Sequence, residues 1–374
     1  MNARQRYVEA LTFGHPDRIP FSPGGPREST LKRWHGEGLP EGVPWRRFLL
    51  ETLGFDDAPA RPHVALGVDF RMIPQFEEKI LEHRESHYIV QDWKGNICEI
   101  SDQFEPRYLR EAIDFVTRRW LKCPVENRDD WEQMKTRYRL DSPGRFPADL
   151  AERGKKLGER DWPLEVSWAG PFWQMREWCG FENLCMMMIE DPAMVADMAA
   201  FWTEFVSKVL ERLLAAVVPD NLHISEDMAY KAKAMISPAM TRQFIKPSWD
   251  RWAAQGRAAG VPIIDVDSDG FIGELIPLWI ESGVNVCDPV EVAAHNDIND
   301  FRRQFGHRMG YVGGVDKRAM AKGGQVIREE LARLEPVIRD GGFIPGCDHG
   351  VPSDISWPDF LDYSRLLAQL TGWL

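Results

Sequence analysis

Three acidic residues stand at alternate positions at the end of an apolar segment. Residues 261–270 read Val-Pro-Ile-Ile-Asp-Val-Asp-Ser-Asp-Gly, and the apolar first half is typical of a buried strand. Alternate residues of a strand point to one side, so Asp265, Asp267 and Asp269 share a face if the backbone stays extended. Like charges this close repel unless a cation or a shared proton intervenes, which indicates a reactive pocket with Asp267 and Asp269 as catalytic groups. The alternative is a solvated turn in which Asp269 caps a helix.

Acidic, basic and sulfur-bearing residues also follow four other predicted strands. In a parallel barrel the active site forms at the carboxyl ends of the strands, so these residues are expected on one rim. Acids alone are weak evidence, because Asp is also a common helix cap. The pattern adds Glu226 to the predicted catalytic groups. The four strand ends carry Glu226 and Asp227; Cys287 and Asp288; Asp316 and Lys317; and Cys347, Asp348 and His349.

The last of these segments offers ligands for a metal ion. It reads Gly-Cys-Asp-His-Gly and places a thiol and an imidazole close together, and both groups are good zinc ligands. We therefore predict a divalent-metal site, with zinc as the ion, formed by Cys347, His349, Asp267 and Glu226. The alternative for Cys347 is a small packed residue of the core.

Aromatic and charged residues near the strand ends are candidates for substrate binding. Trp168 and Trp173 suggest an apolar contact, and Arg176 suggests an anionic group. Arg27 follows a glycine pair that lets the backbone approach a ligand, so we predict that it also binds an anionic group of the substrate. Asp227 completes the predicted substrate site. The alternative for each is a packing or surface role.

From about residue 160 onward, strand patterns alternate with helical patterns. Asp191-Pro192 and Ser237-Pro238 are predicted to start helices, because each pairs a capping side chain with a proline suited to the first turn. Such alternation predicts a parallel sheet, either doubly wound or closed into a barrel. No G-x-G-x-x-G follows an early strand, which favours a (β/α)8 TIM barrel. Strands are predicted at 164–170, 221–227, 261–270, 284–287, 309–315 and 343–349, with an aromatic loop at 171–176.

Two further features are expected around this α/β barrel. Residues 1–60 are predicted to form a helical lead-in around one strand, with a helix at 3–13 and an extended segment after it. Residues 87–93 and 97–100 flank Lys94-Gly95-Asn96, which predicts a β-hairpin inserted near the barrel mouth. The whole chain, 1–374, is predicted to be a single domain.

The composition is that of an ordinary soluble globular protein. The chain has 374 residues, 44% hydrophobic and 28% charged, and its net charge of −12 argues against a nucleic-acid surface. Its six cysteines form no C-x-x-C pair, which favours reduced thiols. The sequence has no signal-peptide core and no apolar run of membrane-spanning length, so a cytoplasmic protein without a membrane segment is expected.

Several short motifs follow one another in an order that is more specific than any one of them. They are His15-Pro-Asp-Arg-Ile-Pro20, Ile236-Ser-Pro238, Asp267-Ser-Asp-Gly270, Gly313-Gly-Val-Asp316 and Gly341-Gly-Phe-Ile-Pro-Gly-Cys347. Together they resemble the uroporphyrinogen decarboxylase superfamily, in particular its branch of corrinoid-linked methyltransferases. The resemblance covers nearly the whole chain and implies a (β/α)8 barrel.

Two departures from the family pattern bear on the reaction. True uroporphyrinogen decarboxylases carry Met-Arg-Gln-Ala-Gly-Arg, which binds the porphyrinogen carboxylates, whereas residues 22–28 here read Ser-Pro-Gly-Gly-Pro-Arg-Glu. Haem-pathway decarboxylation is therefore not expected. In the methyltransferase branch a His-x-Cys and a further Cys hold zinc. Here Asp267 and Asp269 replace the first pair and only Cys347 matches in kind, which makes a harder, more oxygen-rich site.

The resemblance implies a methyltransferase that moves a methyl group between a small-molecule donor or acceptor and a corrinoid, with metal assistance. The chain has no Asp-x-His-x-x-Gly cobalamin motif, so the corrinoid is expected on a partner protein. A homodimer is also implied. Two alternatives stay open. A metal-free decarboxylase or hydrolase would use Asp267 as acid or base, its pKa raised by Asp265 and Asp269. A non-catalytic barrel would bind a corrinoid or another tetrapyrrole.

Overall fold

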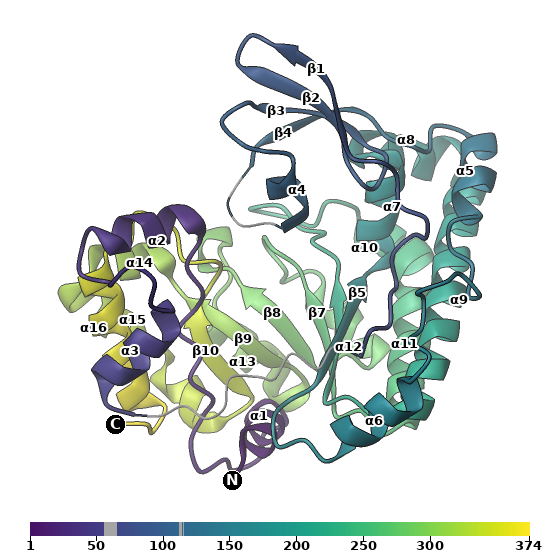
Figure 1. Cartoon of the computed structure of the whole chain (residues 1–374). Coiled ribbons are helices and arrows are strands. Elements are labelled where there is room, and N and C mark those ends of the chain that lie inside the picture. The colour runs from purple at the N-terminus through teal and green to yellow at the C-terminus, as the bar shows by residue number, and fades with distance from the viewer. Residues whose placement is uncertain (56–65, 112–113, 115) are drawn as a thin grey trace.

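A parallel sheet of six strands forms the centre of the computed structural model, which describes residues 1–55, 66–111, 114 and 116–374 (Figure 1). Its strands are β5 (Glu165–Ala169), β6 (Asn221–Ser225), β7 (Ile263–Asp267), β8 (Val286–Val290), β9 (Gly310–Val315) and β10 (Phe343–Cys347). They lie in the order β10-β9-β8-β7-β6-β5, so each strand pairs with its neighbours along the chain. The α/β class and the parallel sheet are confirmed.

Helices connect these strands, and they begin where the sequence provides caps. Asp191 accepts a hydrogen bond from Met194 N at 3.1 Å at the start of α9 (Pro192–Ala216). Ser237 accepts one from Met240 N at 3.2 Å at the start of α10 (Pro238–Met240). The loop predicted at 171–176 is wrong, because Pro171 opens helix α7 (Pro171–Cys179).

The remaining helices lie before, between and after the strands. Within the described residues, none of the helices combines the length and the apolar character that crossing a bilayer demands. These helices are α1 (Ala3–Leu11), α2 (Glu28–His35), α3 (Trp45–Leu53), α4 (Arg107–Glu111), α5 (Arg128–Lys135), α6 (Leu150–Gly158), α8 (Phe181–Glu190), α11 (Lys246–Ala258), α12 (Ile276–Ser282), α13 (Ile298–Phe305), α14 (Lys317–Lys322), α15 (Gly324–Asp340) and α16 (Trp357–Leu370).

Among the described residues, no ladder joins the two edges of the parallel sheet. An extended segment before α2 lies along β10 instead. A Cβ at Gly346 would be 2.2 Å from the carbonyl oxygen of Ser22, and Pro26 forms a parallel bridge with Val351. Pro23 and Pro26 remove N–H donors that a ladder needs. The segment predicted to be a strand in the lead-in is extended but does not pair as a strand of the sheet, so that prediction is wrong. Closure into an eight-stranded barrel stays a prediction.

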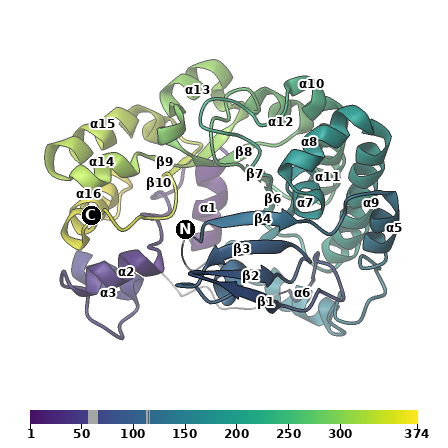
Figure 2. The same ribbon diagram turned by 90° about the horizontal axis from the view of Figure 1, so that it is seen from above.

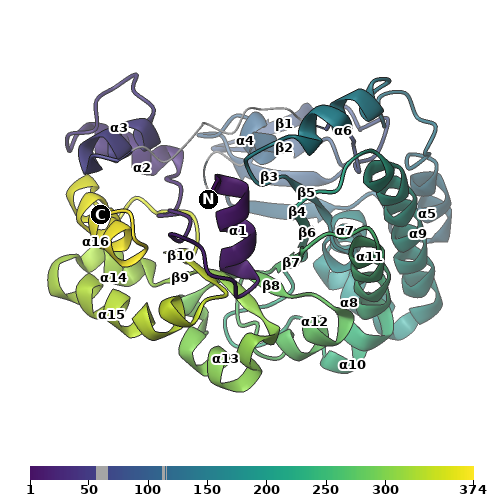
Figure 3. The same cartoon turned by 90° about the horizontal axis from the view of Figure 1, so that it is seen from below.

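Helix α1 covers the amino-terminal side of the sheet (Figure 3). Its residues Ala10 and Leu11 form a buried cluster with Ile263, Val286 and Ile344, which belong to β7, β8 and β10. Apolar side chains thus cover the first inward-facing positions of the strands. Polar side chains further along the same strands face the space above this layer.

A second sheet lies beyond the carboxyl ends of β7 and β8 (Figures 1 and 2). Its strands are β1 (Lys79–Arg84), β2 (His87–Gln91), β3 (Ile97–Ser101) and β4 (Arg118–Lys122), which pair antiparallel in this order. The strands predicted at 87–93 and 97–100 are part of this larger sheet. Lys94, in the turn between them, forms an ion pair with Glu177 of α7 at 2.5 Å, which fixes the turn to the helix.

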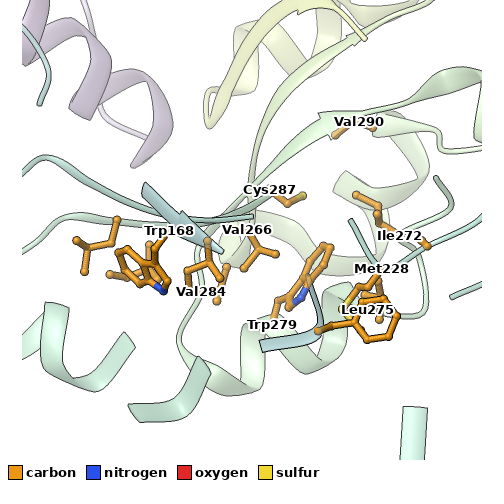
Figure 4. Close-up of a cluster of buried hydrophobic side chains, with 14 of the residues drawn as sticks. Trp168, Met228, Val266, Ile272, Leu275, Trp279, Val284, Cys287 and Val290 are labelled. Atoms are coloured by element: carbon orange, nitrogen blue, oxygen red, sulfur yellow. The ribbon is translucent and has the colours of Figure 1, made fainter. Parts of the chain in front are cut away.

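The outer face of the parallel sheet packs against the helices in the main hydrophobic core. Val266 of β7, Cys287 of β8 and Trp279 of α12 are fully buried there, and Trp168 of β5 joins the same cluster (Figure 4). The outer positions of the strands are therefore apolar, and the chemistry has to lie on the inner face.

A buried ion pair ties the segment before β5 to the start of β6. Asp220 accepts hydrogen bonds from Arg160 Nη2 at 2.6 Å and from Leu164 N at 2.9 Å. Its other oxygen accepts one from Arg4 Nε of α1 at 2.7 Å. The side chains of Arg160 and Asp220 are each 2% exposed. A charge buried this deeply is tolerated only with its partner in place.

We predict that Asp220→Ala lowers the free energy of unfolding by about 3–5 kcal/mol, because Arg160 would keep a buried charge without its carboxylate. The measurement is urea denaturation followed by circular dichroism. Glu152→Ala is the control, since its ion pair with Lys156 at 2.9 Å is exposed and such pairs contribute less than about 1 kcal/mol. Equal effects of the two substitutions would contradict the stabilising role of Asp220.

Candidate active site

A cavity of about 430 Å³ lies at the carboxyl ends of the parallel strands. Its polar side chains come from β6, β7, β8 and the segments after β7 and β10, and small residues such as Gly25 and Val312 fill the rest of the wall. Acids and histidines dominate the lining. The ionisable side chains that line it are His223, Asp267, Asp269, Asp288, Cys347 and His349.

The strand register explains why these side chains meet. His223 of β6 pairs with Asp265 of β7, Ser225 pairs with Asp267, and Asp267 pairs with Asp288 of β8. Residues two apart in a strand face the same side, so this set faces inward. The residues between them belong to the hydrophobic core, and these are Ile224, Val266 and Cys287.

His223 lies among three carboxylates. Its Nδ1 is 2.8 Å from Asp265 Oδ2 and 3.9 Å from Asp288 Oδ1. Its Nε2 is 3.8 Å from Asp267 Oδ2. Burial disfavours the charged imidazole, but the nearby carboxylates of Asp265 and Asp288 raise the pKa of His223 well above its ordinary value. The protonated ring offsets part of the negative charge around it.

Two inward-facing acids hold a proton more firmly than an exposed carboxyl group does. Burial raises the pKa of Asp267 to about 7, with His223 opposing the shift and Asp269 adding to it. Burial also raises the pKa of Asp288 well above its usual range, and Asp265 adds to that shift. Acids of this kind can exchange protons with a substrate near neutral pH.

A second set of groups lies across the cavity on the segment after β10. His349 Nε2 is 3.3 Å from Asp269 Oδ2, and this hydrogen bond raises the pKa of His349. Arg27 Nη2 lies 3.5 Å from His349 Nδ1. Burial raises the pKa of Cys347 to about 12, so its thiol is neutral. The structure thus brings the predicted residues Asp267, Asp269, Cys347 and His349 to one cavity, with Arg27 beside it.

Glu226 lies apart from this cavity, contrary to the prediction. Its Oε2 accepts hydrogen bonds from Phe172 N at 3.0 Å and Trp173 N at 3.3 Å. Its Oε1 accepts one from Trp249 Nε1 at 2.6 Å. The side chain is one residue out of phase with the inward-facing Ser225, so it points toward the helices. Glu226 therefore holds the start of α7, and burial raises its pKa to about 8.

Four of the predicted substrate-binding residues also lie away from the cavity. Trp168 is 4% exposed and stacks on Phe70, with ring centroids 5.5 Å apart. Arg176 Nη2 pairs with Asp227 at 2.9 Å, and the guanidinium lies 4.5 Å from the ring centre of Trp173. These side chains pack in the core or at the junction of α7 with the end of β6, so none of the four lines this cavity, and their contact with substrate stays a prediction.

The four predicted zinc ligands do not come together. Glu226 faces the helices, and within the described chain Cys347, His349 and Asp267 belong to no group of three ligand atoms in mutual reach. The side chains present therefore do not fit the zinc site predicted from the sequence. The group that has this geometry, with ligand atoms within 4.8 Å of one another, comprises Glu165, His223 and Asp265.

His223 and Asp288 both line the cavity, but neither was among the residues predicted to be catalytic, substrate-binding or metal-binding. The signal for His223 was its alternation with Ser225, which repeats the spacing of Asp265 and Asp267 on the next strand. The sequence does not give the register between the two strands, and it is this register that places His223 next to Asp265. Asp288 was placed on the rim after a strand predicted to end at 287, whereas β8 runs to Val290 and includes it.

Comparisons with known proteins place the chain in a family and match its fold to a solved structure. A family model described as "Uroporphyrinogen decarboxylase (URO-D)" matches residues 120–358. A solved methyltransferase from Methanosarcina mazei has a TM-score of 0.58 at 14% identity, covering 100% of this chain and 98% of that one. A B12-independent methionine synthase from a Shewanella species has a TM-score of 0.41 at 12% identity, covering 95% of this chain and 97% of that one. No curated protein matches the chain in sequence.

We predict that Glu226→Gln changes how stability depends on pH. The carboxyl group has an ordinary pKa of 4.5 and a folded-state pKa of about 8. The folded chain therefore holds this proton more firmly than the unfolded chain, and its contribution to stability is lost as the pH rises through about 8. Gln does not titrate. In urea denaturation, the free energy of unfolding of the variant should therefore fall less steeply between the ordinary pKa of 4.5 and the folded-state pKa of about 8.

The contrasting variant is Glu152→Gln, because the Glu152 side chain is 67% exposed on the surface and pairs with Lys156. It should leave the pH dependence of unfolding near that of the wild type. A Glu226→Gln curve parallel to the wild-type curve would mean that Glu226 has the same pKa in the folded and the unfolded chain, which contradicts the rise that burial causes.

Proposed function

Because the chain belongs to the uroporphyrinogen decarboxylase family, we propose that it is an enzyme whose active site is this cavity. We propose further that it moves a methyl group between a small substrate and a corrinoid held by a partner protein. The main support for this cavity as the active site is that His223, Asp267 and Asp288 all line it, and its volume is about 430 Å³. Pockets of about 300–1,000 Å³ hold small molecules. The reaction class, the corrinoid carrier and the homodimer rest on the sequence resemblance alone.

The charge of the lining favours a neutral or cationic substrate. Asp267, Asp269 and Asp288 line the cavity together. A substrate with several carboxylates would bring like charges into a confined space. Arg27, next to His349, could hold at most a single anionic group. A methylated amine, ether or thioether therefore suits the lining better than a porphyrinogen with many carboxylates.

Asp267 is the proposed acid–base group. Its backbone carbonyl accepts a hydrogen bond from Glu226 N at 2.9 Å, so the end of β7 that carries it is fixed. When the bond between the methyl carbon and the substrate heteroatom breaks, the heteroatom keeps the electron pair and receives a proton from the Asp267 carboxyl. In the opposite direction, the carboxylate takes that proton back. The corrinoid supplies the cobalt that exchanges the methyl group.

A decarboxylase without a metal is the second candidate. It would use the carboxyl group of Asp267, which lines the cavity and whose pKa burial raises to about 7. A protonated carboxyl group can supply the proton that replaces carbon dioxide on a substrate carbon. Both candidates use the same side chain, and they differ in the product that is released.

We predict that Asp267→Asn lowers kcat/KM by about 100- to 10,000-fold, because the amide cannot give or take the proton. The assay follows methylcobalamin formation from free cob(I)alamin with a panel of methylated amines, ethers and thioethers. The variant should lose less than about 1 kcal/mol of stability, since a side chain at the cavity wall contributes little packing. Release of carbon dioxide from carboxylic acids, without methyl transfer, would favour the second candidate.

Asp316→Asn is the matched control. Asp316 also follows a strand of the same sheet, but its carboxylate caps α14 at Arg318 N and pairs with the Arg318 side chain at 2.9 Å. Asn keeps a capping oxygen, so activity should be retained. Full activity of Asp267→Asn, or an equal loss in Asp316→Asn, would remove Asp267 from the proposed chemistry.

A further inference from the structure

We propose that Glu165, His223 and Asp265 form a binding site for a divalent transition-metal ion next to the cavity, with His223 belonging to both. Ligand atoms of the three side chains lie within 4.8 Å of one another, so a single ion can reach all of them. The side chains come from the neighbouring strands β5, β6 and β7. The site is separate from the zinc site predicted from the sequence, which would use Cys347 and His349.

The register of the parallel ladder places these ligands together. His223 pairs directly with Asp265, and Glu165 pairs with Asn221, which lies two residues before His223. Residues two apart share a face, so the ligands and Asn221 all point inward. Because the backbone at each position is held by the ladder, the ligands sit on rigid elements, as metal sites require.

A buried amide beside the ligands has an oxygen without a partner. Asn221 is 0% exposed, and its Nδ2 lies 3.1 Å from Glu165 Oε2 and 3.3 Å from Asp265 Oδ2. The same nitrogen lies 3.2 Å from the Tyr7 hydroxyl, which can also donate. Asn221 Oδ1 makes no hydrogen bond to any described residue. If the nitrogen and oxygen of the amide are exchanged, the oxygen points between the carboxylates of Glu165 and Asp265, where it could bind a cation.

Asp265 provides a second oxygen of this kind. The residue is 3% exposed, and its Oδ2 accepts the hydrogen bond from His223, but its Oδ1 has no partner in the described chain. Buried polar atoms without partners are uncommon and call for an unseen water or ion. One cation would satisfy the free oxygen of Asp265 and, once the amide atoms of Asn221 are exchanged, the oxygen of Asn221 as well. It would also offset the negative charge that Asp267 and Asp288 bring to the same face.

The donor set indicates the kind of ion. One imidazole nitrogen combined with carboxylate and amide oxygens suits Mn²⁺ or Zn²⁺, since imidazole favours zinc and oxygen ligands favour manganese. His223 also lines the cavity, and its Nε2 is 3.8 Å from Asp267 Oδ2. The ion would therefore add positive charge next to the proposed acid–base group. The inference does not depend on the proposed function, because its test measures binding rather than turnover.

The test uses the full-length chain, stripped of metal with a chelator and then titrated with Mn²⁺ and with Zn²⁺ by calorimetry. The wild type should bind one equivalent of at least one of these ions. Glu165→Gln and His223→Ala should each weaken that binding by at least about 10-fold, because each removes a ligand atom. Glu165→Gln keeps the shape of a solvent-exposed side chain, so it should fold normally even if His223→Ala does not.

The matched control is the double variant Cys347→Ser with His349→Ala, which removes two of the zinc ligands predicted from the sequence. It should bind the ion with the affinity and stoichiometry of the wild type. The proposal is overturned if the wild type binds neither ion saturably. It is also overturned if the double variant loses binding while Glu165→Gln keeps it.

Discussion

The parallel register of β6, β7 and β8 is the constraint on which the whole site depends. One face of these strands packs against helices, so every second residue must be apolar, and the residues between them face inward. Ser225 pairs with Asp267 and Asp267 pairs with Asp288, so inward-facing acids on successive strands lie at one level. A shift of β7 by one residue would bring Val266 to the cavity and drive Asp267 into the hydrophobic core.

The fold concentrates negative charge at one place and gives it few compensating groups. Around His223, the carboxylates of Asp265, Asp267 and Asp288 can remain together only by holding protons, by pairing with the imidazole or by binding a cation. By contrast, the buried acids Glu226 and Asp220 accept several hydrogen bonds each, and they stabilise the start of α7 and the start of β6. Incompletely compensated acids mark the site, in keeping with the general clustering of perturbed groups where chemistry occurs.

The sequence allowed the strand and helix alternation to be predicted, because caps such as Asp191 and Ser237 are local signals. It also placed Asp267 and His349 at strand ends that lead to one cavity. The sequence alone does not show whether an acid near the end of a strand points into the cavity or toward the helices. Glu226 was misassigned for that reason, since it differs from Ser225 by a single step of the pleat. His223 was missed because its partners lie on the next strand and only the register reveals them.

The most direct test of the account is a crystal structure of the chain bound to a methylated compound that proves active in the methyl-transfer assay. The account predicts density for the compound in the cavity, with its heteroatom within hydrogen-bonding distance, about 3 Å, of the Asp267 carboxylate. His223 should lie between Asp265 and Asp267, and Glu226 should face Trp249. Density outside the cavity, or an Asp267 side chain turned into solvent as a helix cap, would contradict the central claim that this cavity is the active site.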